Sequence, residues 1–290
     1  MKYGLHVPHF GPLATTEFMK RTAQTAERLG FASLWVSDHV VVPHEFDDAY
    51  PYRSDGVISL DPRTPFHDPF ALVPWLAGIT TTPEIGIGAF VAPYRHPVVT
   101  AKLIGTADFL SGGRTRMVAG AGWMKEEFDV LGVPFEERGR ITDETLDLLT
   151  RAFSEPSLDT VVGPVGMEPR PLRRPYPLMV GGHTKVAMRR ALRLGHGWQG
   201  TPQHAGQVDE LVEKLADVNG GSIPEGFIVA TRLHISRYDP DTGRDAVMQQ
   251  VRDARAPRVD EVVLSIIDPD VERFFARLEA LGEWLKEDQA

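Results

Sequence analysis

The chain has 290 residues, no cysteine and a formal net charge of −9 at pH 7. The lack of cysteine excludes disulfides, thiolate metal ligands and a cysteine nucleophile, and the acidic balance without a run of Lys or Arg argues against nucleic acid and membrane surfaces as partners. The first residues, MKYGLHVPHFG, do not read as a secretory signal, and no apolar run approaches the ~18 residues of a membrane span, so we expect a cytoplasmic protein.

Eight short apolar runs predict β-strands, because most of them are apolar on both faces, as parallel strands covered by helices are. In chain order the strands span residues 3–7, 33–36, 85–89, 115–119, 177–180, 197–199, 228–235 and 261–266. Longer amphipathic runs predict helices over residues 16–29, 97–110, 142–153, 185–194, 203–218, 243–254 and 271–286. Thr16 is a suitable cap for the first helix, and Gly30 a suitable end.

Strands that alternate with helices favour a (β/α)8 TIM barrel, one domain over residues 1–290. An open doubly wound sheet is the competing fold. Its only glycine signal, Gly120-Ala121-Gly122, lacks the third glycine of a dinucleotide site. Two irregular stretches, near residues 42–67 and 154–175, interrupt the barrel as insertions. Insertions of this length are either functional lids or neutral additions.

The second predicted strand ends in three polar residues, Ser37, Asp38 and His39. Catalytic groups of a barrel lie at the carboxyl ends of its strands. His39 can therefore move a proton near neutral pH or donate a hydrogen bond, and Asp38 can orient it or bind a ligand. The alternative is a histidine in an ordinary hydrogen-bonded turn.

Two more strand ends carry residues suited to a site. Arg95, after the third strand, can meet an anionic ligand or a surface carboxylate. In GAGWMKEEF, residues 120–128, Trp123 and Met124 are large and apolar where an exposed loop is expected, which suits a substrate wall. Glu126 or Glu127 can place a carboxylate near the site, or both belong to a solvated first helical turn.

The fifth predicted strand ends in Gly181 and Gly182, which are followed by His183, Thr184 and a helix. Glycines let the backbone approach a ligand closely, and the free N–H groups of a helix start favour an anion. This pattern indicates a phosphate cradle without the residue order of a Walker loop. A plain glycine-rich strand-to-helix turn is an equally good interpretation.

A metal-hydrolase interpretation rests on His6-x-x-His9 after the first strand, with His183 and His234 later in the chain. The spacing is not a specific zinc signature, so we expect no metal.

Taken together, these stretches resemble the bacterial luciferase-like oxidoreductases, in particular the subgroup that uses the deazaflavin coenzyme F-420. The resemblance spans nearly the whole chain. Its most specific pieces are ERLGFASLWVSDHVVVP, APYRHPVVTAKLIGTADFLSGGR, GAGWMKEEFDVLGVPFEERGRITDE and VGGHTKVAMRRALRLGHGW. It implies a (β/α)8 barrel with insertions, which is often dimeric.

The resemblance also implies roles for individual residues. Asp38 and His39 stand where similar enzymes place a coenzyme-contacting acid and an active-site histidine. Ala89 and Phe90 match a segment with a non-prolyl cis peptide that bulges behind the deazaflavin ring. The remaining coenzyme contacts implied are Gly120, Ala121 and Gly122 along the coenzyme, and Gly181, Gly182, His183 and Thr184 at its phosphate.

The chain departs from the sugar-phosphate dehydrogenases of this family at two positions. Trp123 replaces the glutamate that follows their glycine pair, and Pro43 replaces a tryptophan after their Asp-His pair. A sugar phosphate is therefore a poor substrate candidate. The acid that partners His39 is displaced, and we assign it to Glu126.

The resulting expectation is an oxidoreductase that transfers a hydride between coenzyme F-420 and a small organic substrate, with His39 and Glu126 as catalytic residues. The alternative on the same fold is an FMN-dependent monooxygenase that uses oxygen and flavin reduced by a partner flavin reductase. A metal hydrolase and a non-catalytic coenzyme-binding barrel are the two further alternatives. We expect a homodimer.

Overall fold

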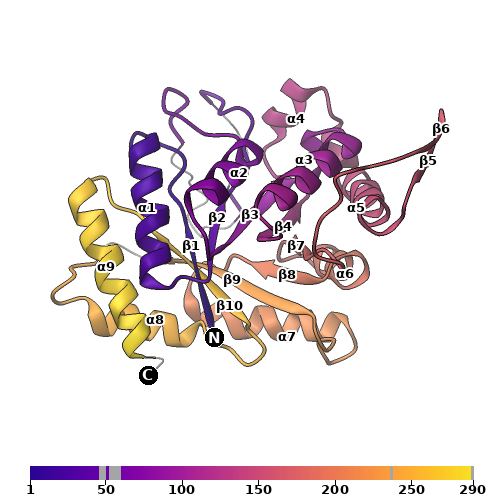
Figure 1. Ribbon diagram of the computed structural model, residues 1–290. Coiled ribbons are helices and arrows are strands. Elements are labelled where there is room, and N and C mark those ends of the chain that lie inside the picture. Colours follow the sequence, from indigo (N-terminus) through magenta and orange to yellow (C-terminus); the bar gives the residue numbers. More distant parts are fainter. Residues whose placement is uncertain (46–49, 52–59, 236–237, 289–290) are drawn as a thin grey trace.

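The computed structural model describes residues 1–45, 50–51, 60–235 and 238–288. Eight parallel strands close into a barrel in the order β1-β10-β9-β8-β7-β4-β3-β2, with helices around it (Figure 1). This confirms the predicted (β/α)8 barrel. The barrel strands are β1 (Lys2–His6), β2 (Ser33–Val36), β3 (Glu84–Val91), β4 (Thr115–Gly120), β7 (Leu178–Gly181), β8 (Gly197–Gly200), β9 (Ile228–Ile235) and β10 (Glu261–Ile266).

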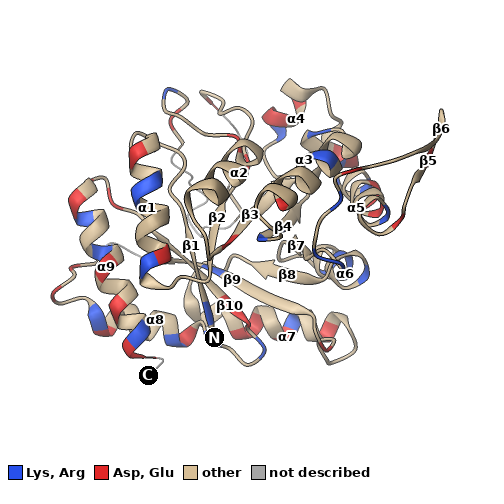
Figure 2. Ribbon diagram, in the orientation of Figure 1, with Lys and Arg blue, Asp and Glu red and all other residues tan. Residues whose placement is uncertain are grey.

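The helices surround the barrel and bury their apolar faces against the outward-facing side chains of the strands. They are α1 (Thr16–Leu29), α2 (Pro69–Ile79), α3 (Pro97–Leu110), α4 (Lys125–Leu131), α5 (Arg138–Ser154), α6 (Lys185–Leu194), α7 (Val208–Val218), α8 (Arg244–Asp253) and α9 (Val271–Glu287), with short 3-10 turns η1 (Ala92–Tyr94), η2 (Phe135–Glu137) and η3 (Ala205–Gln207). Lys, Arg, Asp and Glu are interspersed along them (Figure 2). No helix of the described residues is long and apolar enough to cross a membrane.

Helix boundaries follow local capping chemistry. Thr15, not Thr16, caps α1, and its side chain accepts a hydrogen bond from the N–H of Phe18 at 3.2 Å. Gly30 ends α1 in the left-handed conformation, as predicted. The helix expected from residue 203 begins only at α7, because a 3-10 turn, η3, precedes it.

Helix α2 was not predicted from the sequence. Asp68 caps it and Pro69 occupies its first turn, but Pro74 lies inside it and its apolar residues show no clear period. An internal proline removes a backbone hydrogen bond, so the sequence signal is that of a broken segment. Packing between β2, β3 and α3 stabilises the helix in spite of that signal.

The barrel interior has a charged amino end and an apolar middle. Arg116 forms ion pairs with Glu261 and, at 3.5 Å, with Glu84, and its guanidinium lies 4.8 Å from the Trp35 ring. Ser33 links the indole N–H of Trp35, at 2.7 Å, to Glu261. Above this network lies the inner apolar cluster, which consists of Trp35, Val118, Met179, Ala230 and Val263. The amino end is therefore closed by a paired polar network, and the carboxyl end is left to form the site.

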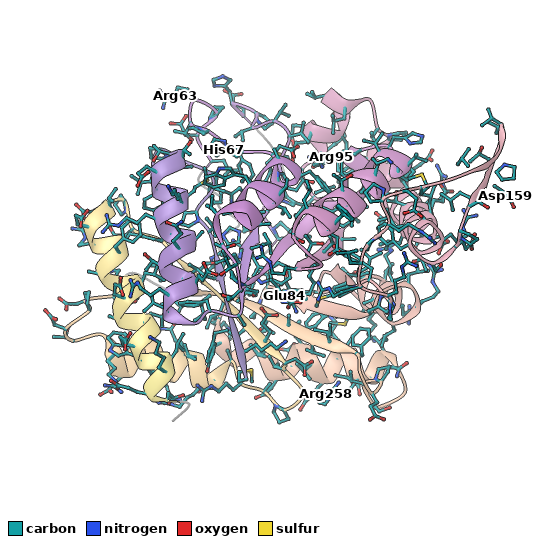
Figure 3. The ribbon with its side chains drawn as sticks, viewed as in Figure 1. Arg63, His67, Glu84, Arg95, Asp159 and Arg258 are labelled. Carbon is teal, nitrogen blue, oxygen red and sulfur yellow. The ribbon has the colours of Figure 1, made fainter. Side chains whose placement is uncertain are left out.

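The predicted insertion at residues 154–175 contains a two-stranded antiparallel hairpin, β5 (Leu158–Thr160) and β6 (Gly163–Val165). The hairpin extends away from the barrel, with Asp159 on it (Figures 1 and 3), and Val161 and Val162 at its tip are exposed. The chain then crosses α3 closely: a Cβ added to Gly105 would lie 2.1 Å from the carbonyl oxygen of Pro169. The predicted insertion at residues 42–67 lies partly outside the described residues.

Candidate active site

The site is built on a pair formed by His39 and Glu127 at the carboxyl end of the barrel. His39 follows β2, and its Nδ1 lies 2.6 Å from Oε2 of Glu127 on α4. The Glu127 side chain is fully buried, whereas that of His39 is 12% exposed. The predicted strand-end histidine therefore has a carboxylate partner, and part of its ring remains accessible from the barrel mouth.

Glu127 receives hydrogen bonds at both carboxylate oxygens. The Tyr94 hydroxyl donates to Oε2 at 2.7 Å, and the backbone N–H groups of Val40 and Val41 donate to Oε1 at 2.7 and 3.2 Å. With His39, these donors fill the roughly four acceptor sites of a carboxylate. Burial opposes ionisation, but the hydrogen bonds from His39, Tyr94 and Val40 outweigh it and hold the pKa of Glu127 below its usual value.

The charge on Glu127 fixes the orientation of His39. An ionised carboxylate only accepts hydrogen bonds, so Nδ1 of His39 must carry a proton. Nε2 of the same ring is then the atom that can take a proton from a ligand or return it. Burial, and then charge repulsion between the Glu127 carboxylate and a tyrosinate, raise the pKa of Tyr94, so Tyr94 stays a donor.

Two predicted residues of this stretch are corrected by the structure. The carboxylate that meets His39 belongs to Glu127, not to Glu126. A helix that begins at Lys125 places residue 127 on the same inner face as Met124 and Phe128. Met124 is fully buried, so its side chain belongs to the core and forms no wall of the site.

Asp38 connects the ends of β2 and β3. Its buried carboxylate accepts the N–H of Val91 at 3.0 Å and contacts the Arg95 guanidinium at 2.7 and 3.0 Å. Arg95 also reaches Asp68 at 2.6 Å; Figure 3 shows it at the mouth end, far along the barrel from Glu84. Burial raises the pKa of Asp38, and Arg95 opposes that rise. The Asp38 side chain thus links β2 to the end of β3 through Val91 and Arg95.

The surface predicted to face the coenzyme ring lies on β3 and β4. The peptide bond between Gly88 and Ala89 is cis, and the register with β4 shifts between Gly88 and Phe90, so Ala89 bulges. This matches the predicted bulge, with the cis bond one residue earlier. A Cβ added to Gly120 would lie 3.3 Å from Cβ of Ala89, so the glycine leaves the surface beside Ala89 free of a second side chain. Ala121 and Gly122 continue the chain beyond β4.

The predicted phosphate cradle lies where β7 turns into α6. Gly181 ends the strand, Gly182 has φ +121°, and Thr184 caps α6 by accepting the N–H of Ala187 at 3.1 Å. Nε2 of His183 accepts the N–H of Thr201 at 2.9 Å. Burial, and then the charge of Lys214, lower the pKa of His183 to about 4, so its ring is neutral at pH 7.

Aromatic rings cover the His39 imidazole. The His39 ring centroid lies 5.1 Å from that of Phe66 and 6.0 Å from that of Trp123. Tyr50 in turn lies 5.4 Å from Trp123, and Phe10 stacks on Phe66 at 5.0 Å. The structure therefore places the predicted wall residue Trp123 directly beside His39, and it adds Phe66 and Tyr50, which the sequence did not single out.

The strands opposite the bulge contribute polar groups to the same end of the barrel. Nε of Arg232 on β9 donates to the Ser265 hydroxyl of β10 at 3.1 Å. His6 of β1 and Gln199 of β8 are buried, and their Nε2 atoms have no partner among the described residues. Burial and then the charge of Arg232 keep the pKa of His6 well below its usual value.

Of the histidines in the metal interpretation, His9 is held by backbone groups. Nδ1 of His9 lies 3.0 Å from the carbonyl of Val7, and its Nε2 accepts the N–H of Ser37 at 3.2 Å. Within the described ranges, no three or more His, Cys, Asp or Glu side chains lie together as a metal site requires.

Sequence reasoning did not assign Tyr94 or Arg232 to the site, and it named Glu127 only as an alternative to Glu126. The helical period from Met124 to Leu131 is the signal that identifies Glu127 as inward-facing. A charged residue inside the apolar run of β9 is the corresponding signal for Arg232, because strands of a barrel alternate between interior and exterior. Tyr94 lies in a short 3-10 turn and has no such signal.

Comparison with known proteins relates this chain to a known family. A family model described as luciferase-like monooxygenase matches residues 4–279. The uncharacterized protein Rv0940c of Mycobacterium tuberculosis is 30% identical over 210 residues, which cover 70% of this chain and 72% of that protein.

Two solved structures share the fold. The monooxygenase RslO1 from Streptomyces bottropensis superposes with a TM-score of 0.74 at 21% identity, over 100% of both chains. An F-420-dependent secondary alcohol dehydrogenase, in complex with an F-420–acetone adduct, superposes with a TM-score of 0.75 at 14% identity, over 97% of both chains. At these identities the likeness concerns the fold alone.

Proposed function

The chain belongs to the luciferase-like monooxygenase family, and from this premise we propose that it transfers a hydride between the deazaflavin coenzyme F-420 and an organic substrate. Members of the family are oxidoreductases and monooxygenases that use a flavin or a deazaflavin. The observation that carries the proposal is the His39–Glu127 pair at the barrel mouth. A hydride that leaves or reaches a carbon bearing oxygen requires a proton partner for that oxygen, and this pair supplies one.

The residues present fit such a coenzyme. The Ala89 bulge and Gly120 form a surface without protruding side chains, which suits a flat ring. Gly182 and the start of α6 offer a phosphate group backbone N–H donors and the positive end of a helix. When bound, the coenzyme supplies the ring carbon that gives or takes the hydride.

The protein's own part is to bind, orient and move one proton. Glu127 keeps Nδ1 of His39 protonated, so Nε2 can take the proton of a substrate hydroxyl or return one to a carbonyl oxygen. Asp38 holds the end of β3 against that of β2 through the N–H of Val91. Trp123 and Phe66 pack beside the imidazole and limit its contact with water.

An FMN-dependent monooxygenase is the second candidate. The aromatic cover of His39 favours it, because a reaction between reduced flavin and oxygen needs a site shielded from water. The fold shared with the monooxygenase RslO1 is compatible with it. This candidate requires a flavin reductase as a partner.

The test is a pair of titrations of the purified protein, one with F-420 and one with FMN, followed by absorbance and fluorescence. We expect selective binding of F-420 at micromolar concentration and no oxygen consumption by the reduced complex. Selective binding of FMN, together with oxygen consumption, would overturn the F-420 proposal and support the monooxygenase. Binding of neither would overturn both.

Two glycine variants make the binding test specific. Gly120→Leu places a side chain against Ala89, where even a Cβ would lie at 3.3 Å, and should weaken binding of the ring at least tenfold. Gly166→Ala is the matched control, because no atom lies within 4 Å of the added Cβ. Equal affinities of the two variants would place the ring elsewhere.

A further inference from the structure

Arg232 occupies an unusual place in the barrel. Its partner across β9 and β10 is Val263, a member of the inner apolar cluster, so the side chain points into the barrel interior. Its Nε donates to the Ser265 hydroxyl of β10 at 3.1 Å, which leaves the two terminal nitrogens of the guanidinium for other partners. The side chain therefore presents its forked end within the carboxyl-end half of the barrel.

No carboxylate compensates this charge in the part of the chain that the structure describes. The bond to Ser265 is the one hydrogen bond of Arg232 among these residues, and its terminal nitrogens have no protein acceptor. Two other arginines of the barrel differ, because each of them pairs with two carboxylates. Arg116 pairs with Glu84 and Glu261, and Arg95 pairs with Asp38 and Asp68.

The groups around Arg232 do not neutralise it either. His6 and His9 are buried beside it, and burial lowers the pKa of both, so both rings are neutral at pH 7. Tyr50 also faces the guanidinium, and its ring packs against Trp123 in the cover of His39. Arg232 is thus close to the aromatic cover and within the same mouth as the proposed proton carrier.

Arg232 is partly buried, and withdrawing a charge from water is costly unless the charge is paired. Arg232 lies on the inner face of β9, and its terminal nitrogens have no acceptor among the described residues. Such a guanidinium can bind the carboxylate of a ligand with two parallel hydrogen bonds. Nε2 atoms of His6 and Gln199 are buried without a partner in the described residues and add further polar groups at this end.

We propose that Arg232 binds the carboxylate of an organic-acid substrate whose apolar body lies against Tyr50 and Trp123. This rests on the proposed function, because it places the acid in the mouth that His39 serves. It narrows the substrate to a compound with an acidic group and an apolar part. Arg232 is then a substrate-binding residue that determines specificity.

The test measures binding of benzoate and of its neutral counterpart benzamide, by calorimetry, to the protein with and without its coenzyme. We expect benzoate to bind at least tenfold more tightly than benzamide. Arg232→Met should abolish this preference and leave benzamide affinity unchanged. Arg232→Lys, which keeps the charge but loses the fork, should retain part of it.

Thermal unfolding separates a binding role from a structural one. Because no carboxylate is left unpaired, Arg232→Met should keep the melting temperature or raise it. A lower melting temperature that Arg232→Lys restores would overturn the proposal in favour of a structural role. Equal affinities of the native protein for benzoate and benzamide would also overturn it.

The coenzyme titrations distinguish the two proposals. Loss of coenzyme affinity in Arg232→Met, with benzoate binding intact, would assign the guanidinium to the coenzyme and overturn the inference. Selective benzoate binding by a protein that binds neither F-420 nor FMN would support the Arg232 site while the proposed function fails.

Discussion

Arg95 holds both carboxylate oxygens of Asp38, with Nη1 2.7 Å from Oδ2 and Nη2 3.0 Å from Oδ1. The Asp38 side chain is fully buried and that of Arg95 is 15% exposed. Because Asp38 also accepts the N–H of Val91, this ion pair joins the segment that carries His39 to the end of the strand that carries the Ala89 bulge. The proposed proton carrier, His39, and the proposed ring surface at Ala89 are thereby held at a fixed distance from each other.

Arg95→Met should destabilise the fold by about 3–5 kcal/mol, because it leaves the Asp38 carboxylate buried and unpaired. Asp38→Asn should cost less, since the amide oxygen can still accept the Val91 N–H and Arg95 keeps Asp68. Urea unfolding of both variants and of the double variant gives the coupling energy. Additive losses would show that the pair contributes no coupling to the fold.

Glu127→Gln keeps one acceptor oxygen, which the N–H groups of Val40 and Val41 occupy, so its NH2 group faces Nδ1 of His39 and no longer holds a proton there. We expect turnover to fall by about 10²-fold, a typical contribution of a positioned proton carrier, while coenzyme affinity stays unchanged. NMR of ¹⁵N-labelled histidine reads the same change directly, as loss of the protonated Nδ1 signal of His39. The comparison variant is Glu126→Gln: a larger loss there would return the role to Glu126.

Tyr94→Phe should cost about 1–2 kcal/mol, because one hydrogen bond to the buried Glu127 carboxylate is lost. The pKa of Glu127 is lowered in the fold, so its contribution to stability is present above its usual value of 4.5 and disappears as the pH falls through the folded pKa. The variant depresses that pKa less. The stability difference between native protein and variant should therefore be largest near pH 7 and shrink on acidification below 4.5, as urea unfolding at several pH values can check.

Stability should also fall between pH 6.5 and 4 through buried histidines. Burial lowers the pKa of His9 from 6.5 to about 4, so in this window the unfolded chain binds a proton that the fold excludes. At about 1.4 kcal/mol per pH unit, this one residue contributes about 3 kcal/mol of lost stability across the window. His6 and His183 act in the same direction.

The contribution of His9 can be isolated by substitution. His9→Gln should flatten the slope of unfolding free energy against pH between 6.5 and 4, although it lowers stability at pH 7 by disturbing the contacts with Val7 and Ser37. His204→Gln is the control, because that side chain is exposed. An unchanged slope in His9→Gln would mean that the ring is not buried as described.

The barrel was predictable because its strands are apolar on both faces and follow one another at regular spacing, and each predicted strand overlaps an observed one. Helix α2 was not, because Pro74 breaks its local signal and only tertiary packing restores it. Local patterns describe neighbours along the chain and say little about contacts between distant segments.

The site residues also divide into those that a local pattern predicts and those that only tertiary contacts determine. Residues at strand ends, such as His39 and Gly181, follow from the fold rule alone. The choice between Glu127 and Glu126 depends on which of them faces inward from a short helix. An error of one residue in the predicted position of that inner face exchanges the two. Arg95 and Asp38 were both singled out, but their pairing spans 57 positions of sequence and no local pattern encodes it.

The two ends of the barrel interior differ in how freely they can change. At the amino end, Arg116 pairs with Glu261 and Glu84, so replacing Arg116 leaves Glu261 as a buried carboxylate without its arginine. At the mouth, Arg232 has no carboxylate among the described residues, so its loss leaves no described carboxylate unpaired. Substitutions at the mouth can therefore change the substrate while the closed end preserves the fold. A library randomised at Arg232 and Tyr50 should contain more folded members than one randomised at Arg116 and Glu261.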